Sequence, residues 1–331
     1  MDLFPIVASP TMGAMSDGTH LLIPFASSRD AGCAAASATL DLPHLEKLLA
    51  RLVPGEADRD EETSLSMPHE RVLARACGLR AADGLIPWAA WEVARSRETG
   101  PTAWAHITPC HWRVGQDHVA MGHPGNLQLA ERESQALLAA MRPYFEEDGI
   151  ALEYRAPTLW LAQGEVFRNL PTASLDRVTG RAIDPWIPRS PEAGPVRRLQ
   201  QEMQMLLYTH EVNEQRERAG LLPVNSFWVS GTGALPAAAP QAMPPGLETT
   251  QALREPGLRG DWHGWAAAWQ LLDSSSCAAL LRRLDAGEAV TLTLCGDRAA
   301  QTWASPGGRG LMRRMGSLFA GKRALAVLES L

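Results

Sequence analysis

The sequence predicts an α/β fold in which a mostly parallel sheet core, flanked by helices, carries an α+β insertion. Strands alternate with helices toward both ends of the chain, which is typical of a parallel-sheet core. From about residue 87 the pattern changes, and several short strands follow one another closely. Antiparallel pairing suits such strands, so we expect an insertion with its own local sheet.

The first part of the core, residues 1–86, is predicted to contain one buried strand and two helices. The run 20–26, HLLIPFA, is typical of a buried strand, and leucines at helical spacing predict an amphipathic helix over 42–52. Pro68 favours the first turn of a second helix, over 68–77. The acidic stretch 56–62 between these helices is expected to be a solvated loop.

The insertion is predicted to span residues 87–193. Alternation over 104–121, with Gly115 in a turn, indicates a hairpin of strands 107–114 and 118–121. After the hairpin we expect a helix over 129–145 and two further strands, over 150–154 and 158–161. The insertion should end at the proline-rich run 185–195.

Residues 194–331 are predicted to form the second part of the core. We expect one helix over 195–218, a strand over 224–229 that belongs to the core sheet, and a glycine turn at Gly231 and Gly233. Ligands of open α/β sheets bind at such strand ends, although an ordinary helix-loop-strand connection would have the same pattern. Later helices at 262–272 and 276–284 lead to a strand at 290–295.

Composition excludes several classes of protein. The 331 residues suffice for one large domain or two of medium size. A formal net charge of −6 offers no basic face to nucleic acid or to a membrane surface. No apolar run approaches the roughly 20 residues that span a bilayer, and no signal-peptide pattern is present. Five cysteines without a CxxC pair favour reduced thiols. We therefore expect a cytoplasmic protein.

The segment 210–233 resembles a motif of the archaeal-type, cofactor-independent phosphoglycerate mutases, which belong to the alkaline phosphatase superfamily. Its matching residues are His210, Val212, Asn213, Arg216, Gly220, Pro223, Asn225, Gly231 and Gly233. Over most of its length the chain more closely resembles a bacterial group known both as phosphoglycerate mutase-like proteins and as RpfE-type regulatory proteins. The resemblance implies an alkaline phosphatase-like core, and it implies ligand contacts by His210, Asn213, Arg216, Asn225, Gly231 and Gly233.

The superfamily's metal and nucleophile positions are poorly matched. The first core strand ends in Pro-Phe-Ala-Ser, at 24–27, where the family has a metal-binding Asp-Gly. Asp297 matches a metal ligand, but an arginine replaces the histidine after it, and arginine has no lone pair for a cation. His263 is the nearest histidine for a second ligand, at a different spacing. Leu65 takes the place of the nucleophilic serine, so Ser66 is either a displaced nucleophile or a helix cap.

Two further groups of residues are candidates for ligand contacts. One contains residue types that bind zinc, namely His106, Cys110, His111, Asp117, His118 and His123. Strand geometry turns several of them to opposite faces, which favours a polar rim in which His111, Asp117 and His118 contact the ligand. The other group is Arg177 and Arg181, which resemble a DRRAGR motif of the mutases and would hold a phosphate or carboxylate, or lie in a solvated loop.

Two hypotheses about function follow. The first is a catalytically degenerate, mutase-like binding or regulatory protein, which takes a small phosphorylated or carboxylated metabolite and needs no cofactor. The second is a metal-dependent phosphomutase or phosphohydrolase, with two divalent cations, manganese or zinc, at a rearranged site that includes Asp297 and His263. Serine phosphoryl transfer in that superfamily depends on both cations, so we expect no mutase activity and prefer the first. A purely structural interaction protein is a third alternative, and the sequence does not identify a protein partner.

Overall fold

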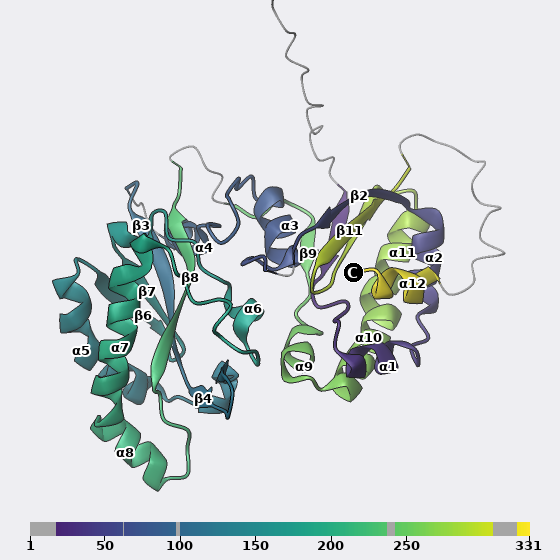
Figure 1. Ribbon diagram of the computed structural model, residues 1–331. Helices are drawn as coiled ribbons and strands as arrows, with labels where there is room; N and C mark the ends of the chain where they lie inside the picture. Colours follow the sequence, from purple (N-terminus) through teal and green to yellow (C-terminus); the bar gives the residue numbers. More distant parts are fainter. Residues whose placement is uncertain (1–17, 62, 97–99, 237–241, 307–322) are drawn as a thin grey trace, which may run out of the picture.

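The protein consists of two lobes, each built on its own sheet (Figure 1). The computed structural model describes residues 18–61, 63–96, 100–236, 242–306 and 323–331. We call the lobe with the five-stranded sheet the core lobe and the lobe with the four-stranded sheet the insertion lobe. The predicted α/β class, with helices on a core sheet and a separate α+β part, is confirmed.

The sheet of the core lobe has the strand order β2-β11-β10-β1-β9. Its strands are β1 (Thr19–Ile23), β2 (Val53–Arg59), β9 (Leu247–Thr249), β10 (Val290–Cys295) and β11 (Ala299–Ala304). β1 pairs in parallel with β10 and β9, while β11 runs antiparallel to β10 and β2. The prediction of a solvated loop at 56–62 is wrong over residues 56–59, because these belong to the edge strand β2. An exposed edge strand with charged side chains has the same composition as a loop.

Helices cover this sheet and bury its apolar side chains. The helices that share the main apolar cluster are α1 (Ala31–Ser37), α2 (Pro43–Arg51), α10 (Trp262–Leu272), α11 (Ala278–Asp285) and α12 (Arg323–Glu329). Helix α3 (Pro68–Ala76) packs against β2 and β11, and α9 (Arg254–Arg259) precedes α10. The helices predicted at 42–52, 68–77, 262–272 and 276–284 are confirmed.

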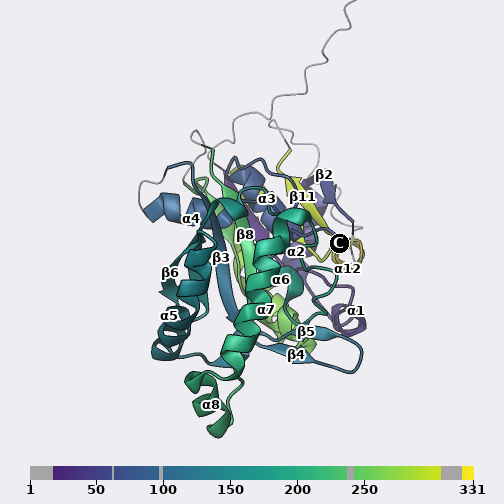
Figure 2. The same ribbon diagram turned by 60° about the vertical axis from the view of Figure 1, so that its left-hand side comes forward.

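The insertion lobe is an antiparallel sheet with the order β6-β7-β3-β8. Its strands are β3 (Ala103–Cys110), β6 (Ala151–Ala156), β7 (Leu159–Gln163) and β8 (Ser226–Ala234). Helices α5 (Glu131–Glu147) and α7 (Gly194–Tyr208) pack together on the sheet (Figure 2), and α4 (Trp88–Ser96) contacts β3 and β8. The remaining elements are α8 (Glu211–Arg218), the hairpin of β4 (Trp112–Val114) and β5 (Val119–Met121), and α6 (Leu175–Val178).

Three details of the insertion lobe correct the predictions. The expected helix over 195–218 is two helices, because His210 caps a new one: its Nδ1 accepts a hydrogen bond from the Val212 backbone N–H at 3.2 Å. The predicted hairpin pairs only 112–114 with 119–121, since β3 pairs with β7 and β8. Strand β8 belongs to this lobe and not to the core sheet, so the lobe continues beyond the predicted end at residue 193. A short apolar run fits a buried strand of either sheet.

Gly231 and Gly233 lie inside β8 and not in a turn after a strand. Their φ angles of +61° and +134° are in the region that favours glycine. A Cβ atom at Gly231 would lie 3.0 Å from His106 Nδ1 and 3.2 Å from Trp88 Cβ, and one at Gly233 would lie 3.1 Å from Pro87 Cβ. The two glycines therefore let β8 pack closely against the start of α4, which is a structural role.

The burial of His20 in β1 should make the protein less stable in mild acid. It is buried, with Nε2 at 2.8 Å from Thr293 Oγ1, and burial lowers its pKa from 6.5 to about 4. The unfolded chain therefore takes up this proton at a higher pH than the folded chain. The contribution of His20 to the free energy of unfolding should be complete above pH 6.5 and be lost as the pH falls to about 4. The total loss in the free energy of unfolding should be about 3 kcal/mol.

Urea denaturation across this pH range measures the effect. The matched variant is His20→Gln, which cannot titrate there but can still hydrogen-bond Thr293. Its free energy of unfolding should fall less on acidification than that of the wild type. Equal losses in the two proteins would contradict the prediction.

Candidate functional site

A cavity of about 660 Å³ lies between the core lobe and the insertion lobe. The parallel strands β1 and β10 end beside it, since Phe25, Ser27, Ser28 and Asp297 belong to its lining. This is the edge at which open α/β sheets bind ligands. Its titratable lining residues are Asp30, His111, Arg113, His123, Arg181, Arg259 and Asp297. Cationic groups outnumber the carboxylates on this surface.

Asp297 carries a carboxylate of the core lobe that is already well supplied with donors. Ser28 Oγ donates to its Oδ2 at 2.9 Å and the Arg29 backbone N–H at 3.2 Å, while Arg181 donates to Oδ1 at 3.2 Å. The Asp297 side chain is 12% exposed. Because Arg181 comes from the insertion lobe, this ion pair crosses the cavity from one lobe to the other.

Basic side chains of the insertion lobe reach the cavity with unused donors. Arg113 in β4 is exposed, and its side chain has no ion pair or hydrogen bond within the described part of the chain. Arg181 is 40% exposed and uses one N–H group on Asp297. His111 Nδ1–H donates to the Pro223 carbonyl oxygen at 2.9 Å, so the Nε2 of a neutral imidazole here is an acceptor and offers no donor to an anion. The guanidinium groups of Arg113 and Arg181 are each suited to a phosphate or a carboxylate.

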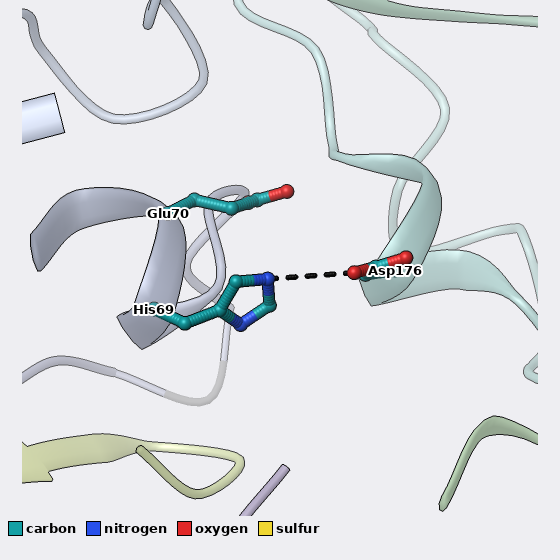
Figure 3. A group of neighbouring side chains, drawn as sticks. All are labelled: His69, Glu70 and Asp176. Atoms are coloured by element: carbon teal, nitrogen blue, oxygen red, sulfur yellow. Dashed lines mark ion pairs between the residues drawn. The ribbon is translucent and has the colours of Figure 1, made fainter. Parts of the chain in front are cut away.

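A second polar cluster lies between α3 and α6 (Figure 3) and consists of His69, Glu70 and Asp176. One potential ligand atom from each lies within 4.8 Å of the others. His69 Nε2 is 3.4 Å from Asp176 Oδ2, and Glu70 accepts a hydrogen bond from the Met67 backbone N–H at 2.7 Å. Arg254 from α9 donates to both oxygens of Asp176.

The charges of this cluster are compensated internally. Burial raises the pKa of Glu70. Burial also opposes ionisation of Asp176, but hydrogen bonds from His69 and Arg254 prevail and lower the pKa of Asp176 to about 2. A cation here would face the Arg254 guanidinium across a single carboxylate and be repelled. We therefore interpret the group as an ion-pair cluster that joins the lobes.

Arg177 and Ser66 belong to this junction and do not line the cavity. Arg177 is buried and donates to the Asp297 carbonyl oxygen at 3.1 Å and to the Ser66 carbonyl oxygen at 3.1 Å. The Ser66 hydroxyl accepts from the Gly84 backbone N–H at 3.1 Å. The prediction that Ser66 caps the following helix is wrong, because the N-cap of α3 is Met67.

The motif residues of 210–225 stabilise the loop before β8. Asn213 Nδ2 donates to the Leu207 and Val224 carbonyls at 2.8 and 2.7 Å, and Asn225 hydrogen-bonds both backbone groups of Trp112. Arg216 is 1% exposed and donates to the Leu222 carbonyl and to Glu133. None of His210, Asn213, Arg216 and Asn225 lines the cavity. Polar side chains at loop ends serve ligands and backbone groups alike, which is why the sequence did not distinguish these roles.

The histidine-rich stretch is spread over the insertion lobe. His111 and His123 line the cavity, whereas Asp117 and His118 are exposed in the turn between β4 and β5. His106 Nε2 pairs with Glu92 at 2.9 Å, and Cys110 is buried. Within the described ranges these residues form no common metal-binding group.

His263 and Asp297 do not both line the cavity. His263 is exposed on α10 and does not line the cavity, whereas Asp297 does. Asp176, Glu70 and Arg254 were not predicted from the sequence. The sequence offers only a weak signal for them: Asp176 directly precedes Arg177, and His69 follows Ser66 closely in the chain.

Comparisons with known proteins give distant matches only. No family model matches the chain, and no curated protein matches its sequence. Among solved structures it is similar to a cofactor-independent phosphoglycerate mutase from Thermoplasma acidophilum, at 12% identity and a TM-score of 0.34 over 95% of this chain and 98% of that one. It is also similar to the PH0037 protein from Pyrococcus horikoshii, at 11% identity and a TM-score of 0.44 over 88% of each chain. Matches this distant identify neither an activity nor a ligand.

The described helices also bear on membrane association. None of them is both long enough and apolar enough to cross a bilayer. The cytoplasmic location stays a prediction.

Replacing Asp176 by asparagine should destabilise the protein strongly. Arg254 and His69 would lose the carboxylate that they share in a largely buried setting, a loss that typically costs about 3 to 5 kcal/mol. Urea denaturation at neutral pH measures the change in the free energy of unfolding. Asp285→Asn is the control, because its carboxylate is 59% exposed and pairs with Arg51 at the surface, where we expect less than about 1 kcal/mol. Similar losses in both variants would contradict the assigned role.

Proposed function

We propose that this chain is a binding or regulatory protein, and that it takes a small phosphorylated or carboxylated metabolite in the cavity between its lobes. One observation carries the proposal: Arg113 and Arg181 line this cavity from the insertion lobe with unused N–H donors. A guanidinium group presents its donors in a planar fork that matches the oxygens of phosphate and carboxylate.

The balance of charge supports an anionic ligand. Of the three arginines in the lining, Arg259 pairs with Glu255 at 2.7 Å and Arg181 with Asp297 at 3.2 Å. Arg113 has no partner in the part of the chain that the structure describes. An anion beside Arg113 would therefore compensate a charge that the protein leaves uncompensated.

Two features support binding without phosphoryl transfer. Ser66, the candidate nucleophile, does not line the cavity, and its hydroxyl accepts a hydrogen bond from Gly84. Asp297, the candidate metal ligand, is paired with Arg181. Serine, metal ligands and substrate would have to meet in one place for the mutase reaction. We therefore propose that the resemblance to mutases reflects a shared architecture, and that the activity is absent.

Substitution of Arg113 tests the anion site. Isothermal titration calorimetry with 3-phosphoglycerate as the probe should show binding by the wild type, weakened roughly tenfold to a hundredfold in Arg113→Gln, because a hydrogen bond to a charged group contributes about 1.5 to 3 kcal/mol. Arg132→Gln, which removes an exposed arginine of α5 outside the cavity, should bind as the wild type does. Absence of binding to the wild type, or equal effects of the two substitutions, would contradict the proposal.

A metal-dependent phosphomutase or phosphohydrolase is the second candidate function. The observation in its favour is the position of Asp297, in a cavity lining at the end of β10 and hydrogen-bonded to Ser28 after β1. Asp30 is the other acidic residue of this lining. Two manganese or zinc ions at this place would have to displace Arg181 from Asp297.

Metal content distinguishes the two candidate functions. We expect less than one equivalent of manganese or zinc by elemental mass spectrometry, in protein purified without chelator or affinity metal, because Arg181 competes for the Asp297 carboxylate. Asp297→Ala provides the comparison. Stoichiometric metal in the wild type that is lost in the variant would favour the enzyme and lead to phosphomutase and phosphatase assays.

A further inference from the structure

The cavity is larger than a three-carbon phosphate ester requires. Its volume of about 660 Å³ equals that of about twenty water molecules. An anion held by Arg113 and Arg181 would occupy one part of this space. The rest of the lining therefore bears on what else the ligand carries.

The lining of the cavity combines cationic with apolar side chains. The insertion lobe contributes the cationic groups of Arg113 and Arg181. The core lobe contributes the charged residues Asp30, Arg259 and Asp297, and it also contributes the apolar side chains of Phe25, Leu258 and Trp262. A ligand that touches both walls needs an anionic end and a flat or apolar end.

Trp262 is the half-exposed aromatic residue of the core wall, and its neighbours hold it in place. Its ring meets that of Trp265 edge to face, with the centroids 6.1 Å apart and an angle of 79°. Trp265 is itself fixed, because it is 1% exposed and its indole N–H donates to the Phe25 carbonyl at 2.8 Å. A side chain at Gly32 would clash with the indole of Trp262. A fixed, half-exposed indole provides a platform on which a planar ring can stack.

Phe25 adds a strained residue to the same wall. Its φ of +56° is in the left-handed region, which is unfavourable for a bulky side chain. Hydrogen bonds from Trp265 and Trp269 to the carbonyls of Phe25 and Ala26 hold the backbone in this conformation. Strain that the surrounding structure maintains is concentrated at ligand sites.

We infer that the cavity binds a nucleoside monophosphate, with the phosphate on Arg113 and Arg181 and the base stacked on Trp262. Such a ligand joins an anion to a planar aromatic ring through a sugar, and its size suits the volume of the cavity. The inference rests on the proposed function, since it requires the anion site, and it specifies the class of metabolite.

Calorimetric titration with matched probes tests this assignment. Ribose 5-phosphate carries the phosphate and the sugar without a base, whereas AMP and GMP carry both. The wild type should bind AMP or GMP roughly tenfold more tightly than ribose 5-phosphate, as stacking on an aromatic side chain provides. Trp262→Leu should remove this preference, so that AMP and GMP bind no more tightly than ribose 5-phosphate does. Trp88→Leu, at a half-buried tryptophan of α4 outside the cavity, should retain the preference.

The outcomes separate this inference from the proposed function. Equal affinities for ribose 5-phosphate and both nucleotides, weakened alike in Arg113→Gln, would overturn the nucleotide assignment and leave the anion site intact. A preference that persists in Trp262→Leu would overturn the role of Trp262. Absence of binding of every phosphate probe to the wild type would overturn both proposals. Thermal denaturation of each variant identifies any that is not folded.

Discussion

The ion pairs of α6 determine how the two lobes meet. Asp176 binds Arg254 of α9 and faces His69 of α3, and its neighbour Arg177 donates to the carbonyls of Asp297 and Ser66. A helix of four residues thus contacts three separate segments of the core lobe. The cavity has one wall from each lobe, so its shape, and the distance between its cationic and its apolar side, depend on these contacts.

Polar and apolar forces have different tasks in this structure. Each lobe has its own apolar cluster, between the core sheet and its helices and between the insertion sheet and α5 and α7. Those clusters stabilise each lobe through burial. Between the lobes, the ion pairs of Asp176 with Arg254 and His69 are accompanied by a smaller apolar cluster, in which Ala74 and Cys77 pack with Ile86 and Trp91.

Periodicity in the sequence predicted most elements but not their partners. The spacing of leucines located α2 and the apolar runs located β1 and β10, because these patterns depend on local burial. It did not assign β8 to its sheet, since a short buried strand looks alike in both lobes. In the cavity, the sequence pointed to His111, Arg181 and Asp297. It did not point to Arg113 or Trp262, which matter because the fold brings them to one cavity. It also did not point to the contact between Asp176 and His69, which are far apart in the chain.

Arg181 connects the anion site to the junction of the lobes. Its guanidinium binds the Asp297 carboxylate, and the carbonyl of the same Asp297 accepts a hydrogen bond from Arg177. In the proposed complex, a phosphate on the remaining N–H groups of Arg181 shares this guanidinium with Asp297 and draws part of its charge away from that carboxylate. Any weakening of the Arg181 to Asp297 pair removes one bond between the lobes, while the ligand adds new bonds to both walls. Ligand binding and lobe arrangement are then linked through one residue, which is the kind of coupling that a regulatory protein requires.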